Sequence, residues 1–169
     1  STLTFLDDRN VYPFWSKEGI QSNLQTLSSL YPSAWNKIYH RRYFNDIQYD
    51  AGLYYEDHPV FYKTFAQARR FGFTPDPAYL HRTRSSGRIT ADGSRRCIDV
   101  FTVLDIIESV LRSHYPYHEL RPILARIQIR LVWERYWVVS NEEVKYQLAE
   151  GLRMRLDRLR TTRDDAMRL

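Results

Sequence analysis

The stretch from Ser94 to Arg160 decides the fold, because it contains three long segments with helical periodicity. The segments read SRRCIDVFTVLDIIESVLRSH (94–114), YHELRPILARIQIRLVWERYW (117–137) and SNEEVKYQLAEGLRMRLDRLR (140–160). In each segment apolar residues recur every three or four positions, as they do on the buried face of a helix. The sequence therefore predicts three consecutive helices.

Short turns separate the three segments. Pro116 ends the first helix, and Pro122 is expected in the first turn of the second, because a proline fits there best. Ser140 is followed three residues later by Glu143, which is the pattern of a capping box at the start of the third helix. Short connections favour antiparallel neighbours. We therefore expect an all-α fold with an antiparallel three-helix bundle over about residues 94–163.

A strip of four residues on the second helix lies outside its apolar face. Arg126, Arg130, Trp133 and Trp137 are spaced i, i+4, i+7 and i+11. Two guanidinium groups one turn apart can bind carboxylates or a phosphate on a partner. The alternative is a solvated helix surface whose tryptophans are covered by the N-terminal part of the chain. We expect the strip to bind a partner, with Arg112 as a further candidate.

The order of these segments resembles the mitochondrial LYR-motif proteins, a family of small three-helix proteins. Residues 139–144 (VSNEEV) match the turn that opens the third helix in that family, and Trp133 stands where the family usually has Phe. The signature Leu-Tyr-Arg triplet is degenerate, since its place falls on Ile106, Ile107 and Glu108. Glu108 reverses the charge of the motif arginine, so Glu108→Arg is expected to strengthen partner binding. The resemblance covers less than half of the chain.

The resemblance implies a partner and a location. Family members dock acyl carrier protein, an acidic helical protein whose acyl-phosphopantetheine arm threads between the helices of the bundle. This chain is then expected to be a non-catalytic accessory subunit of a mitochondrial respiratory-chain assembly, with complex I (NADH:ubiquinone oxidoreductase) the first choice. It would lie on the matrix side of the inner membrane, among neighbouring subunits, with no cofactor of its own. A matrix assembly or iron–sulfur biogenesis factor of the same family is the alternative.

The composition adds a third alternative. The chain has 169 residues, of which 43% are hydrophobic, and a formal net charge of +5 with a pI near 9.4. Such a basic chain suits an acidic protein, or a nucleic acid in a ribosome-associated role. The basic residues of the helices alternate with acidic ones, which disfavours the nucleic-acid reading. No run reaches the roughly 20 apolar residues of a membrane span.

Residues 1–93 differ in kind from residues 94–169, which form the expected LYR-like domain. They hold nine of the thirteen tyrosines, and prolines interrupt them repeatedly. We expect an irregular, partly helical arm whose rings pack against the bundle or against a neighbouring subunit. Its expected short helices and its extended strap lie at about Lys17–Tyr31, Ser33–Phe44, Pro59–Phe71 and, for the strap, Gly72–Gly93.

Candidate catalytic and metal-binding residues are scarce. The single cysteine, Cys97, lies on an apolar face and excludes an internal disulfide. His114 and His118 are four residues apart, but Pro116 breaks the helical register between them. The adjacent acidic pairs near the two ends, at residues 7–8 and 164–165, are more simply explained as solvated charge than as acid–base groups. We therefore expect no metal site and no enzymatic activity.

Overall fold

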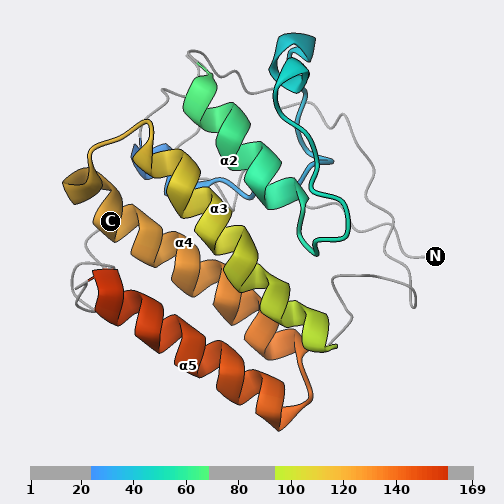
Figure 1. Cartoon of the computed structure of the whole chain (residues 1–169), viewed down its shortest axis with the longest axis vertical. Coiled ribbons are helices and arrows are strands. Elements are labelled where there is room, and N and C mark those ends of the chain that lie inside the picture. The colour runs from blue at the N-terminus through green and yellow to red at the C-terminus, as the bar shows by residue number, and fades with distance from the viewer. Residues whose placement is uncertain (1–23, 69–93, 160–169) are drawn as a thin grey trace.

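The computed structural model of the chain describes residues 24–68 and 94–159 (Figure 1), and these residues form helices and turns without a strand. The predicted all-α class is confirmed for this part of the chain. The expected strap and the acidic pairs near the ends lie outside the described residues. The elements in order are α1 (Leu24–Ser29), the 3₁₀ helix η2 (Arg41–Asn45), α2 (Asp57–Gln67), the 3₁₀ helix η4 (Arg95–Ile98), α3 (Asp99–Arg112), α4 (Tyr117–Val138) and α5 (Glu142–Leu159).

Helices α3, α4 and α5 occupy the three segments with helical periodicity. Helix α4 begins at the predicted residue, and α5 follows it after a three-residue turn. The first segment is divided, since the Ser94 side chain caps η4 by accepting a hydrogen bond from the Arg96 N–H, and η4 leads into α3. Figure 1 shows the three helices side by side, with the two turns at opposite ends of α4. None of the described helices is long and apolar enough to cross a membrane.

Two details at the helix starts differ from the sequence prediction. Pro122 is the sixth residue of α4 and so lies in its second turn. The hydrogen bond that Pro122 cannot donate would end on the carbonyl of His118, near the exposed end of the helix, where water can replace the donor. Asn141, not Ser140, caps α5, because its side-chain oxygen accepts the Val144 N–H at 3.2 Å.

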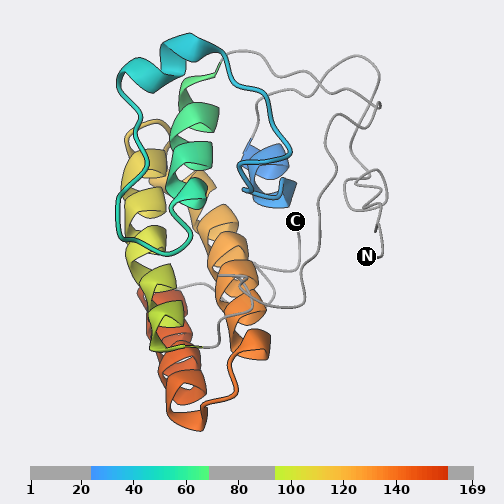
Figure 2. The same cartoon turned by 90° about the vertical axis from the view of Figure 1, so that its right-hand side faces the viewer.

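Aromatic residues of the expected arm belong to the same hydrophobic core as the three long helices. The core joins residues of α1 and α2 to residues of α3, α4 and α5, and Figure 2 shows α2 alongside α3. These rings therefore pack against helices of their own chain. The arm residues of this shared cluster that are less than 9% exposed are Leu27, Tyr55, Phe61, Tyr62 and Phe65.

The expected helix over residues 33–44 is not formed, and only η2 is helical there. Side chains bind the backbone of this segment in place of a helical ladder. The Lys37 ammonium donates to the carbonyls of Tyr31 and Ser33, and the Ala34 N–H donates to Asp57. Helix α2 forms close to its predicted place. Helix α1 lies within the helix predicted at about Lys17–Tyr31, and residues 17–23 of that prediction lie outside the described residues.

Helices α3 and α5 approach each other closely at Gly151. A Cβ atom at this position would lie 2.3 Å from the tip of the Phe101 ring, a distance that side chains do not tolerate. The ring of Phe101 therefore occupies the space that a side chain on α5 would fill. Only glycine allows this contact without a shift of the ring.

Leu104 tests the core that these helices share. It is 1% exposed and lies in the same cluster as residues of α2, α4 and α5. We expect Leu104→Ala to lower the free energy of unfolding by roughly 2 to 5 kcal/mol, because it leaves a cavity in a packed core. Chemical denaturation measures this loss, with the exposed Met154→Ala as the control. A loss below about 1 kcal/mol would contradict the placement of Leu104.

Candidate functional site

The C-terminal half of α4 carries a group of three aromatic side chains, Trp133, Tyr136 and Trp137, which we call the aromatic cluster. The two tryptophans are exposed, and Tyr136 is partly buried against the core. The rings of Trp133 and Tyr136 lie almost parallel, 6° apart, with centroids 5.8 Å from each other. The Trp137 ring stands nearly perpendicular to both, at 5.3 Å from Trp133 and 6.1 Å from Tyr136. The three rings therefore support one another as a single surface.

The aromatic cluster remains open to solvent. Trp133 is 53% exposed and Trp137 is 67% exposed. On its α5 side, the Lys145 ammonium lies 5.8 Å from the Tyr136 ring centroid and donates a hydrogen bond to Glu142. Tryptophan and tyrosine dominate the binding energy of protein interfaces, because each buries a large rigid surface and still offers a polar atom. The cluster has the composition of such an interface.

The structure separates the four residues of the predicted strip. Arg130 points inward, where its guanidinium donates to the Ser28 carbonyl at 3.0 Å and to the Tyr62 hydroxyl at 3.2 Å. It therefore joins α1 and α2 to α4. Arg126 is half-buried, and the two tryptophans are exposed. The predicted strip is therefore an aromatic surface next to one structural arginine. Tyr136 also belongs to this aromatic surface, although it does not have the spacing of the predicted strip.

The three positions of the degenerate motif face the inside of the helical layer. Ile107 is fully buried and Ile106 is half-buried. The Glu108 carboxylate is 8% exposed and accepts a hydrogen bond from Arg158 of α5 at 3.0 Å. Arg112 is exposed and also pairs with Glu108, at 3.6 Å, while its guanidinium lies over the Tyr117 ring. Glu108 thus holds α5 against α3 and is not presented to a partner.

This placement changes the expected outcome of Glu108→Arg. A third guanidinium would lie against Arg112 and Arg158, and both would lose their carboxylate. We expect Glu108→Arg to lower the free energy of unfolding by roughly 1 to 3 kcal/mol, since it puts a third positive charge at a buried position and breaks ion pairs whose arginines are half-exposed. Thermal and chemical denaturation measure this loss. The control is Ser109→Arg, an exposed neighbour on α3, and equal stability of the two variants would contradict the pairing.

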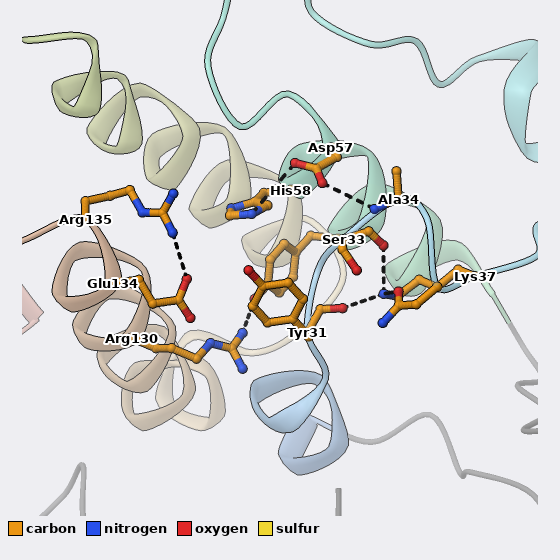
Figure 3. A network of polar contacts seen from close by, with 11 residues as sticks. Tyr31, Ser33, Ala34, Lys37, Asp57, His58, Arg130, Glu134 and Arg135 are labelled. Atoms are coloured by element: carbon orange, nitrogen blue, oxygen red, sulfur yellow. Dashed lines mark hydrogen bonds and ion pairs between the residues drawn. The ribbon is translucent and has the colours of Figure 1, made fainter. Parts of the chain in front are cut away.

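A network of buried polar residues connects α2 and the segment after α1 to α4, on another side of that helix (Figure 3). Asp57 accepts the Ala34 N–H at 3.2 Å, and His58 follows it in the first turn of α2. Arg135 of α4 donates to Glu134 at 3.2 Å, and its guanidinium lies 4.6 Å from the Tyr55 ring centroid. No periodic pattern in the sequence predicts this network, because its members come from three separate segments.

Burial sets the protonation of this network. Burial lowers the pKa of His58 to about 3, and the nearby charges of Arg135, Arg130 and Lys37 act in the same direction. The imidazole is therefore neutral, and its 3.7 Å approach to the Asp57 carboxylate is not an ion pair. Burial also raises the pKa of Asp57, and the Ala34 N–H partly opposes this.

The lowered pKa of His58 predicts a pH dependence of stability. The unfolded histidine titrates near its usual pKa of about 6.5, so between that value and the folded pKa the unfolded state binds one more proton. Stability is then complete above about pH 6.5 and falls as the pH drops, by up to about 1.4 kcal/mol per pH unit. His58→Phe should remove this dependence, because the ring remains but no longer titrates.

Denaturation curves from about pH 5 to about pH 8 measure the effect, and this window avoids the titration of unfolded carboxyl groups. His118→Gln is the matched control, since His118 is exposed at the start of α4. A slope that is the same in His58→Phe and in the unchanged protein would contradict a neutral His58.

The described residues do not assemble a group that could hold a metal ion. No cluster of three or more histidine, cysteine, aspartate or glutamate side chains in residues 24–68 and 94–159 could hold a metal ion. His114 and His118 are both exposed. Cys97 is buried, and its Sγ atom accepts a hydrogen bond from the Tyr55 hydroxyl at 3.6 Å. The aromatic cluster is therefore the best-developed candidate site.

Comparisons with known proteins add no assignment. No protein-family model, no curated protein and no solved structure matches this chain.

Proposed function

We propose that this protein is a non-catalytic helical subunit that binds a partner protein through the aromatic cluster of α4. The observation that carries the proposal is the exposure of Trp133 and Trp137 on a rigid helix, in contact with each other and with Tyr136. The helix itself is held in place by the core, so the rings are ordered before binding. Pre-ordered aromatic anchors lose little conformational entropy when a partner covers them.

The resemblance to the LYR-motif proteins supports a more specific form of the proposal. The partner is then mitochondrial acyl carrier protein, and α3, α4 and α5 form the family's antiparallel three-helix bundle. The chain is an accessory subunit of a respiratory-chain assembly, complex I first, on the matrix side of the inner membrane. Any acyl-phosphopantetheine at the site belongs to the partner, and this chain brings no cofactor of its own.

The contacts divide the candidate residues into two roles. Trp133 and Trp137 supply apolar area, and Arg126, two turns before Trp133 on α4, supplies positive charge toward an acidic partner. Arg130 is a structural residue, because it is bonded to Ser28 and Tyr62. Charge reversal at Arg130 would disturb the fold, so Arg126 is the cleaner test of electrostatic docking.

Binding of purified acyl carrier protein to the full chain tests the proposal. We expect Trp133→Ala/Trp137→Ala to weaken binding by about 30-fold or more, since the loss of even one buried aromatic anchor costs about 2 kcal/mol or more. Arg126→Glu should weaken binding and reduce its dependence on salt, because an attraction screened by ions is lost. Calorimetric titration measures both effects.

Matched controls are Met154→Ala, an exposed apolar residue on α5, and Arg153→Glu, an exposed arginine on the same helix. Circular dichroism must show that every variant keeps its helices. Absence of acyl carrier protein binding in the unchanged chain would rule out this partner. Equal binding by the tryptophan variant and the controls would rule out the aromatic cluster as the binding site.

A further inference from the structure

A second exposed surface lies at η2, far along the chain from the aromatic cluster. Figures 1 and 2 both show η2 at an edge of the molecule, apart from α4 and α5. We call this surface the η2 tip and define it by its exposed apolar and basic side chains. These are Ile38, Arg41, Arg42, Phe44 and Tyr49.

The η2 tip is an ordered turn. The His40 ring nitrogen accepts the Arg42 N–H at 3.2 Å and so caps the 3₁₀ helix. Edge-to-face packing of Tyr39 on Phe44, with centroids 5.7 Å apart, closes the turn from the side. Ile47, only 2% exposed, anchors the end of the turn. The backbone of the turn and the Phe44 ring are therefore held in position outside the core.

An aliphatic side chain at the tip points into solvent. Ile38 is 91% exposed, the highest value among the exposed large hydrophobic residues of the described chain, and Tyr49 and Phe44 add exposures of 46% and 36%. Exposure of isoleucine forgoes the free energy that its burial would supply. The fold buries Ile47 of the same turn and leaves Ile38 outside, although both carry the same side chain.

Positive charge accompanies the exposed isoleucine. Arg41 and Arg42 are both exposed in the first two positions of η2. Arg42 lies over the Tyr43 ring, at 5.1 Å from its centroid. Asp46 lies in the same segment and Asp50 follows it, but Asp50 pairs with Lys63 at 3.9 Å. Within the described part of the chain no carboxylate forms an ion pair with Arg41 or Arg42, so their guanidinium groups remain available to an anion.

We propose that the η2 tip binds an anionic lipid surface. Arginine guanidinium groups bind lipid phosphates, and isoleucine and phenylalanine enter the boundary between the head groups and the acyl chains. An RNA backbone also attracts arginines, but it offers no apolar layer for an aliphatic side chain. Ile38 therefore favours a membrane surface over a nucleic acid. The chain would lie on this surface through one turn and two charges, as a peripheral contact.

Sedimentation of the full chain with lipid vesicles tests the proposal. Vesicles of phosphatidylcholine alone are compared with vesicles of equal parts phosphatidylcholine and phosphatidylglycerol. We expect binding to the anionic vesicles only, with Arg41→Gln/Arg42→Gln reducing the partition coefficient by about 20-fold or more. Ile38→Ser should reduce it by about 10-fold, because the apolar contribution is lost.

Matched controls separate this site from general charge and hydrophobicity. Arg95→Gln/Arg153→Gln removes the same charge from exposed positions elsewhere, and Met154→Ser removes an exposed apolar side chain from α5. Both control variants should retain vesicle binding. Equal losses in the controls and the tip variants would overturn the proposal, as would the absence of binding to anionic vesicles. Binding of single-stranded RNA that depends on Arg41 and Arg42, with vesicle binding indifferent to Ile38, would also overturn it.

Discussion

The burial of α4 is the constraint on which the rest of the described structure depends. Helices α1, α3 and α5 all pack against it, and its buried residues extend from Leu120 to Arg135. Because apolar side chains are needed on several sides, only a narrow strip of α4 can face solvent. That strip ends in Trp133 and Trp137. The candidate site is therefore the part of α4 that the core leaves uncovered, and its rigidity comes from the core beneath it.

The contacts around α4 require a strained backbone at one residue, and the packing of the core must offset the free energy of that strain. Tyr55 has a positive φ of 65°, a conformation that costs a non-glycine residue about 1 to 2 kcal/mol. Its ring is held between His58 and the Arg135 guanidinium, and its hydroxyl donates to the sulfur of Cys97. One buried tyrosine thus connects α2, η4 and α4. Because Arg135 makes these contacts, it is a structural residue, although its neighbours on the same turn of α4, Trp133 and Trp137, are exposed.

Features that depend on local sequence patterns, such as the helix boundaries, could be predicted from the sequence. The roles of side chains whose partners are distant in the chain could not. Helix α4 was predicted to within one residue, because apolar periodicity and Pro116 define it locally. The role of Arg130 could not be predicted, since its partners Ser28 and Tyr62 lie 102 and 68 residues away in the chain. Glu108 was interpreted as a changed partner contact, but Arg158, 50 residues further on, makes it a contact between helices. A charged residue has the same spacing along a helix whether it pairs with another helix of the fold or with a partner protein, so the sequence pattern does not distinguish the two.

The close approach of Phe101 to Gly151 fixes the register between α3 and α5. One turn beyond this contact, Arg155 donates to the Phe101 carbonyl and to Asp105, and further along Arg158 donates to Glu108. These contacts follow one another in the same order along both helices. Sliding α5 by one turn would remove the glycine from beneath the ring and offset both arginines from their carboxylates. Helix α5 therefore cannot slide along α3 without breaking these contacts, so the alignment of the two helices depends on Gly151, Arg155 and Arg158 together.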